Sequence, residues 1–147
     1  MLALVVSILQ LKAGRKHNRL SVRPFVIPHI ERDKNTILIY LRNDGLGPAL
    51  IKGFYIKLGN KEIVNPNNDP YKNWVLSDGR ENTSFEYEYF IPTVSSTIKA
   101  NDKVQLLKVT FVKEGDELLD LVEEQFNFRI TYTSMYEDMK WSSKIGH

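Results

Sequence analysis

Apolar side chains recur at every second position in five stretches of this chain, and this period constrains the fold more than any other feature. The stretches are residues 37–42, 54–58, 85–91, 107–111 and 126–132. A two-residue period places the apolar side chains on one face of an extended strand. Each stretch therefore predicts a β-strand with one buried face.

Turn-forming residues separate these stretches. Asn, Asp, Gly and Pro are concentrated at residues 43–45, 59–60, 65–70, 77–79 and 100–102. Short turns of this kind join antiparallel neighbours, whereas parallel strands need a crossover helix between them. We therefore predict a mainly β protein, an antiparallel sandwich of six or seven strands.

Two further elements complete the predicted body. Leu20 to Ile30 is expected to form the first strand, and Pro24 and Pro28 confine it to a sheet edge or a bulge because proline lacks an amide donor. Gly115 to Gln125 is the one helix candidate in the body, since Asp116 can cap its first turn and apolar residues recur on one face. This short helix is expected to cover one open end of the sandwich.

The N-terminus has a different character. Met1 to Leu11 is apolar apart from Ser7 and Gln10, and no Asp or Glu occurs before Glu31. The run is too short for a complete span, because a helix that crosses the hydrocarbon needs about 20 apolar residues. Three interpretations remain open: the end of a transmembrane helix whose beginning is missing, an interfacial anchor helix, or a helix packed on the domain.

Five cations follow the apolar run. They are Lys12, Arg15, Lys16, Arg19 and Arg23, and they leave 15 basic against 18 acidic residues in the rest of the chain. Lys and Arg near a membrane end are retained on the cytoplasmic side, so the cluster predicts a membrane-interface site and a cytoplasmic body. A cleavable signal peptide would place its charges before the apolar region instead.

We accordingly divide the chain into a membrane-associated helix with a basic linker at 1–19 and a folded domain at 20–147. The domain is mildly acidic, which argues against a nucleic-acid partner because such partners require clustered Lys and Arg. The chain contains no cysteine, which excludes disulfides and thiol chemistry.

Two passages carry a resemblance to a known group. The first is Arg15 to Pro24 together with Leu41-Arg-Asn-Asp-Gly-Leu-Gly-Pro-Ala-Leu-Ile51, and the second is Ile130-Thr-Tyr-Thr-Ser-Met-Tyr-Glu-Asp138. They resemble small uncharacterised bacterial single-pass membrane-anchored proteins, in which a basic segment and an Arg-Pro strand follow one helix. Glu137 stands where that group usually has Gly. The resemblance implies an immunoglobulin-like β-sandwich behind a membrane helix, and it implies no activity.

The motif from Asn43 to Ala49 has a structural interpretation. Asn43 can bond the backbone of its own turn, Gly45 and Gly47 can adopt positive φ, and Pro48 fixes the exit. Binding of a phosphate is not expected, since neither a Lys-Ser/Thr pair nor a helix start follows the glycines.

No catalytic or metal-binding pattern stands out. The histidines, His17, His29 and His147, have no ligand spacing, and Asn65 to Asp69 lacks the alternate acids of a calcium loop. The acidic cluster from Glu114 to Glu124 has the spacing of a solvated helix face. We expect no enzymatic activity, no cofactor and no small-molecule substrate.

A long loop from Asn60 to Asn82 is the main candidate for binding a protein. Its Tyr71, Trp74 and Arg80 are residue types favoured at interfaces, although they can equally plug one end of the sandwich. The same two interpretations, binding a protein or plugging an end of the sandwich, apply to Tyr136 and Trp141.

The expected function is a non-enzymatic, membrane-tethered interaction domain. Its N-terminal segment contacts the lipid bilayer, and its sandwich binds an unknown protein partner at the cytoplasmic face. The alternative is a periplasmic or surface β-sandwich domain that acts in adhesion or envelope assembly.

Overall fold

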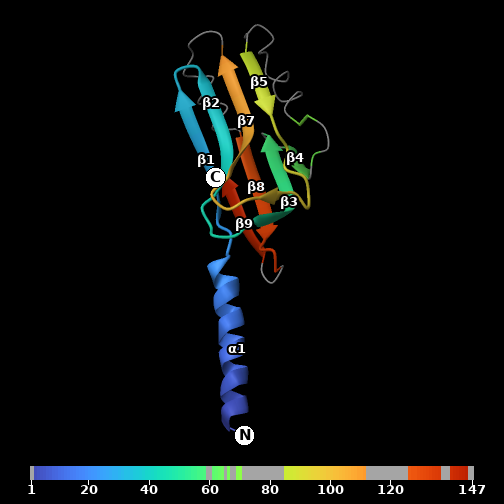
Figure 1. The fold of residues 1–147 in the computed structure, drawn as a ribbon. Coiled ribbons are helices and arrows are strands. Elements are labelled where there is room, and N and C mark those ends of the chain that lie inside the picture. Colours follow the sequence, from blue (N-terminus) through green and yellow to red (C-terminus); the bar gives the residue numbers. More distant parts are fainter. Residues whose placement is uncertain are drawn as a thin grey trace.

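The computed structural model describes residues 2–58, 61–64, 66, 69–70, 85–111, 126–136 and 140–145. Within these ranges lie one helix and nine strands (Figure 1). In chain order they are α1 (Leu2–Ser21), β1 (Val26–Asp33), β2 (Thr36–Asn43), β3 (Ala49–Leu58), β4 (Lys61–Val64), β5 (Phe85–Tyr89), β6 (Thr97–Ile98), β7 (Lys103–Phe111), β8 (Phe126–Thr133) and β9 (Lys140–Ile145).

The strands form two antiparallel sheets. One sheet has the order β1-β2-β7-β5, and the other has the order β4-β3-β8-β9, with β6 paired to the start of β3. All pairs between the described strands are antiparallel. The structure therefore confirms that the protein is mainly β and antiparallel.

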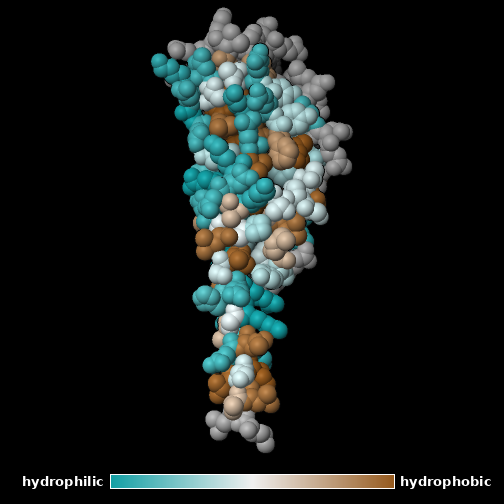
Figure 2. Space-filling model, in the orientation of Figure 1, coloured by the Kyte–Doolittle hydropathy of each residue, from teal (hydrophilic) through white to brown (hydrophobic). Residues whose placement is uncertain are grey.

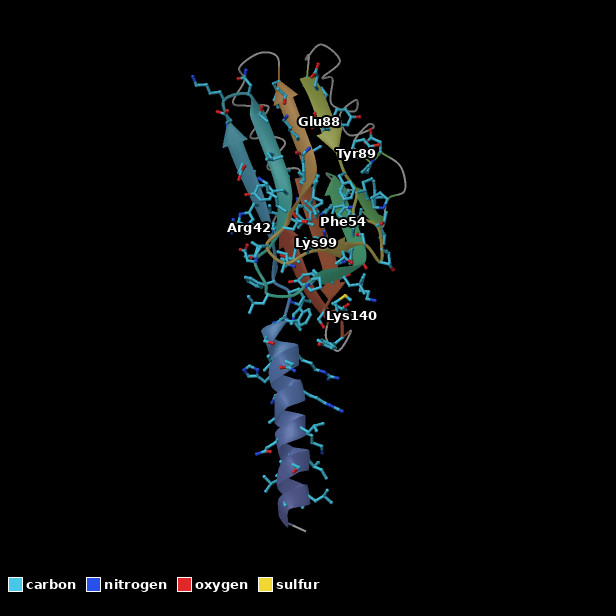
Figure 3. All side chains as sticks on the ribbon, in the orientation of Figure 1. Arg42, Phe54, Glu88, Tyr89, Lys99 and Lys140 are labelled. Atoms are coloured by element: carbon cyan, nitrogen blue, oxygen red, sulfur yellow. The ribbon has the colours of Figure 1, made fainter. Side chains whose placement is uncertain are left out.

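Both sheets contribute to a single hydrophobic core. The alternating apolar positions of β2 and β7 share one buried cluster with those of β3 and β8, and Figure 3 shows Phe54 in its interior. Burying one such side chain stabilises the fold by roughly 1.5–3 kcal/mol relative to leaving it in water. The most fully buried large side chains are Ile37, Ile39, Leu41, Ile51, Phe54, Ile56, Leu106, Leu107, Phe126 and Ile130.

Three strands were not predicted. β4 and β6 are short, and β9 has the sequence Lys-Trp-Ser-Ser-Lys-Ile, in which two serines weaken the strand signal. Trp141 and Ile145 nevertheless pack against the core because they lie opposite the inward residues Tyr132 and Phe128 of β8.

The N-terminal helix is longer than predicted. α1 continues through the basic stretch to Ser21, so residues 12–19 are helical rather than a linker. The predicted strand from Leu20 to Ile30 begins only at Val26. Lys, Arg, Gln, Leu and Ala are all good helix formers, and the helix ends only as Pro24 approaches, because a proline disfavours the helical conformation just before it.

α1 projects away from the body along the general direction of the strands (Figure 1). Its apolar side chains remain uncovered: Leu4, Ile8, Leu9 and Leu11 are 50–67% exposed. Figure 2 shows this apolar surface around the first half of the helix and hydrophilic surface beyond it, toward the body. Among the described residues, no helix combines the length and the apolar character needed to cross a membrane.

Two expectations fall outside the described residues. They are the short helix at 115–125 and the candidate partner-binding residues Tyr71, Trp74 and Arg80. Of the long loop that carries these three residues, the structure describes β4, Pro66, Asp69 and Pro70.

Asp69 is anchored to β5 by a hydrogen bond of 2.6 Å from the hydroxyl of Tyr87. Burial, together with this bond, raises the pKa of Tyr87 from 10.0 to about 12. The folded chain therefore keeps a proton that an unfolded tyrosine loses above pH 10, so this contribution to stability is complete below that pH and is lost between pH 10 and about 12.

Replacing Tyr87 with Phe removes this late-titrating phenol. In an ultraviolet absorbance titration of the folded protein, we expect Tyr87→Phe to remove the absorbance change of one phenol near pH 12. Persistence of that change in the variant would show that another tyrosine is responsible.

Candidate membrane interface

The basic residues of α1 lie along one side of the helix. Lys12, Arg15, Lys16 and Arg19 have the spacing i, i+3, i+4 and i+7, which brings side chains onto the same helix face. Together with Leu20 they line a shallow hollow. Four of the five cations predicted from sequence as a cluster therefore form a continuous stripe, which can bind an anionic surface.

Two arginines link this stripe to the body. The guanidinium of Arg19 lies 5.8 Å from the ring centre of Tyr136, and that of Arg23 lies 5.1 Å from the ring centre of Trp141. Such cation–π contacts contribute about 0.5–1 kcal/mol at exposed sites. Tyr136 lies just after β8 and Trp141 lies in β9, so the helix exit is held against the β8–β9 end of the second sheet.

The cations and the aromatic residues of this arrangement were predicted separately, and their contact was not. The arginines were predicted to be cationic membrane contacts, whereas Tyr136 and Trp141 were treated as a separate choice between binding and packing. Trp141 is half-buried beside Tyr132, with 5.9 Å between the ring centres. Because more than 100 residues separate each arginine from its aromatic partner in the chain, no local sequence pattern could reveal these contacts.

The segment between α1 and β1 is fixed by the loop between β2 and β3. The amide of Leu46 donates to the carbonyl of Arg23 at 3.1 Å, and the amide of Asp44 donates to the carbonyl of Phe25 at 2.9 Å. These bonds satisfy backbone groups at a point where the chain passes from helix to strand.

Asn43 organises this loop from a completely buried position, with 0% of its surface exposed. Its Oδ1 accepts hydrogen bonds from the amides of Phe25 at 3.0 Å and Gly45 at 3.1 Å. Its Nδ2 donates to the carbonyl oxygens of Gly47 (2.8 Å), Ile98 (3.1 Å) and Lys99 (3.1 Å). The structure thus confirms the prediction that Asn43 bonds its own turn, and adds a bridge to two other segments.

The two glycines of the loop are required for a different reason from the one predicted. A Cβ atom on Gly45 would lie 2.4 Å from the carbonyl oxygen of Arg23, and one on Gly47 would lie 1.8 Å from that of Val22. Gly45 and Gly47 can adopt positive φ, but neither glycine has a left-handed φ in the structure. The absence of a side chain is needed because the loop and the helix exit touch through their backbones.

Large apolar side chains remain exposed at this end of the body. Leu46, at the tip of the loop, is 73% exposed, and Phe25 and Tyr136 are each more than half exposed. The backbone of Leu46 is hydrogen-bonded to that of Arg23, and the ring of Tyr136 contacts Arg19, so these exposed side chains lie at the same end of the body as the arginines. Apolar and aromatic side chains mixed with arginine are the combination found where proteins meet a lipid interface.

The predicted membrane-interface residues are thus brought together, whereas the candidate partner-binding loop lies outside the described residues. The ring of His29 stacks on that of Tyr40, with 5.2 Å between the centres. Within the described part of the chain, no three His, Cys, Asp or Glu side chains are grouped so that they could hold a metal ion.

Comparison with known proteins places the chain in a family. No curated protein and no solved structure gives a significant match. The profile of one family matches residues 1–145, which include both α1 and the β-sheets. The chain therefore belongs to the family described as a domain of unknown function (DUF8453).

Proposed function

We propose that this protein is a non-enzymatic interaction domain that α1 tethers to a membrane. The apolar first half of α1 enters the lipid, the stripe of Lys12, Arg15, Lys16 and Arg19 lies among anionic headgroups, and the body binds a protein partner on the cytoplasmic side. In this arrangement the folded domain stands at the membrane surface.

The order of features along α1 carries the proposal. From its N-terminus outward, the helix presents exposed apolar residues, then cations without an acid, then the apolar and aromatic side chains around Arg19 and Arg23. An uncovered apolar helix surface in water is unfavourable by about 25 cal/mol per Å² of apolar area. Lipid removes that cost, and anionic headgroups add attraction to the neighbouring cations.

We also propose that the body is an immunoglobulin-like sandwich. The sheet order β1-β2-β7-β5 opposite β4-β3-β8-β9 corresponds to the order A-B-E-D opposite C′-C-F-G of that fold. Immunoglobulin-like sandwiches host many unrelated activities, so this likeness supports an interaction role only together with the surface features of this chain.

Orientation follows from the same cations. Lys and Arg close to a membrane-inserted segment are retained in the cytoplasm, and all five cations lie between the apolar half of α1 and the body. A reporter fused to the C-terminus is expected to be active in the cytoplasm. Activity on the opposite side of the membrane would instead support the periplasmic or surface alternative.

Neutralising part of the stripe tests the membrane contact. Each Lys or Arg near an anionic surface contributes about 1 kcal/mol, so replacing Lys12, Arg15 and Lys16 with Gln should weaken binding to phosphatidylcholine–phosphatidylserine vesicles by about 100-fold. Co-sedimentation with these vesicles, and with vesicles of phosphatidylcholine alone, measures the effect.

A matched control removes three cations of the body, by replacing Lys34 in the β1–β2 turn and Lys103 and Lys108 in β7 with Gln. This variant has the same net charge as the stripe variant, and it is expected to bind the anionic vesicles as tightly as the wild-type protein does. Equal losses in the two variants would mean that total charge, and not the stripe on α1, determines binding.

A further inference from the structure

The outer faces of the two sheets carry different charges. On the β3-β8-β9 side, Lys57, Arg129, Lys140 and Lys144 lie on the face turned away from the core, and Glu62 is the one acid in the strands of this sheet. The outer face of the β1-β2-β7-β5 sheet mixes both signs, with Glu31, Asp33, Glu86 and Glu88 among Arg42, Lys103 and Lys108. A basic face on a mildly acidic body is electrostatically complementary to an anionic partner.

The cations surround a hollow on this face. The hollow has a volume of about 240 Å³, and Tyr55, Lys57, Glu62, Asn127, Arg129 and Lys144 contribute to its walls. The guanidinium of Arg129 lies over the ring of Tyr55, 4.4 Å from its centre. The aromatic ring holds this long side chain in place and reduces the entropy that it would lose on binding a ligand.

Positive charge in the hollow is poorly compensated. Arg129 and Lys144 lie directly opposite each other on neighbouring strands, an arrangement that destabilises a sheet. Among the described residues, Arg129 pairs with Glu62, which lies on β4 opposite Lys57; Nη2 of Arg129 and Oε1 of Glu62 are 3.9 Å apart, and both side chains are more than half exposed. Such a pair contributes little, so a bound carboxylate would relieve the repulsion between Arg129 and Lys144.

Distance from α1 decides between lipid and protein as the occupant. Lys140 begins β9 at the end nearer to α1 (Figure 3), and Lys144 lies four residues further on. At about 3.3 Å per residue, Lys144 is roughly 13 Å beyond Lys140 along the strand, more than the Debye length of about 8 Å in physiological salt. With α1 upright in the membrane, headgroups would therefore be screened from the hollow.

We propose that this hollow docks an extended acidic segment of a partner protein, whose Asp or Glu carboxylates contact Lys57, Arg129 and Lys144. The proposal rests on the proposed function for the upright orientation and specifies which surface receives the partner. Because the strands that carry these cations run in the general direction of α1 (Figure 1), the partner would meet this sheet face from along the membrane rather than from the lipid.

The test uses the full chain in zwitterionic detergent and a fluorescent oligoglutamate peptide, with anisotropy as the readout. Replacing both Lys57 and Lys144 with Glu is expected to weaken peptide binding by at least about tenfold, mainly through slower association. The control replaces Lys34 and Lys103, both exposed on the other side, with Glu and is expected to change the affinity by less than about twofold.

A second measurement shows that the substituted protein is folded. The Lys57→Glu, Lys144→Glu variant should unfold at a similar urea concentration, because Glu at position 144 faces Arg129 favourably whereas Glu at position 57 faces Glu62 unfavourably.

Equal peptide losses in the two double variants would overturn the proposal. It would also be overturned if the Lys57→Glu, Lys144→Glu variant retained the peptide but lost binding to phosphatidylserine vesicles, since the face would then be a lipid contact. The peptide assay contains no anionic lipid, so failure of the membrane proposal appears only in the vesicle assay with the α1 stripe variant.

Discussion

Replacing Asn43 with alanine is expected to lower the free energy of unfolding by about 3–5 kcal/mol. The substitution removes a buried amide that bonds five backbone groups, and it leaves the amides of Phe25 and Gly45 without their acceptor. Each buried polar group left unsatisfied costs about 1–3 kcal/mol. Urea unfolding followed by tryptophan fluorescence measures the change.

The matched control is Asn18→Ala, on an exposed part of α1. Alanine favours a helix over asparagine, so this variant should change stability by no more than about 0.5 kcal/mol. If Asn43→Ala destabilised the protein by no more than the control, the loop would be held by its backbone bonds alone.

The second large effect is expected at Gly47. A Cβ atom there would overlap the carbonyl oxygen of Val22, and because the obstacle is backbone, the helix exit or the loop must move. We expect Gly47→Ala to cost about 3 kcal/mol, the upper part of the range for overpacking. Urea unfolding gives the loss, and hydrogen exchange should show weaker protection of the Leu46 amide, which donates to Arg23.

Gly14→Ala is the corresponding control, because nothing lies within 4 Å of a Cβ atom at that position. Gly14 is inside α1, where alanine is favoured by about 0.8–1 kcal/mol, so the variant should gain helical circular dichroism. A comparable loss of stability in both variants would show that the measured cost does not arise from crowding at Val22.

Period-two apolar patterns predicted five strands because each strand buries one face in a shared core. The same period-two pattern does not reveal β9, because Ser142 and Ser143 interrupt the alternation of apolar residues although Trp141 and Ile145 still pack inward. It also placed the first strand too early, since Val22 and Leu20 were grouped with Val26 although the helix continues to Ser21. At this boundary, helix propensity outweighed the apolar pattern.

The candidate membrane interface was only partly predictable. Charge alone identified Arg19 and Arg23, and turn chemistry identified Asn43, because both signals are local. The stacking of the arginines on Tyr136 and Trp141 depends on strand pairing between distant segments. The role of Gly47 depends on a backbone contact with Val22, which composition cannot show. The basic face likewise appears only when β3, β8 and β9 are placed side by side.

The backbone contact between Gly47 and Val22 has a mechanical consequence. A helix joined to a domain by a slack linker can swivel, and any surface of the domain then samples all directions. Here backbone hydrogen bonds and two arginine–aromatic contacts hold the end of α1 against the body, and Gly45 and Gly47 lie in direct backbone contact with it. A rotation of α1 about its axis therefore requires the sheets to rotate with it. A rotation or tilt imposed on the helix would therefore change the orientation of the basic hollow by the same angle.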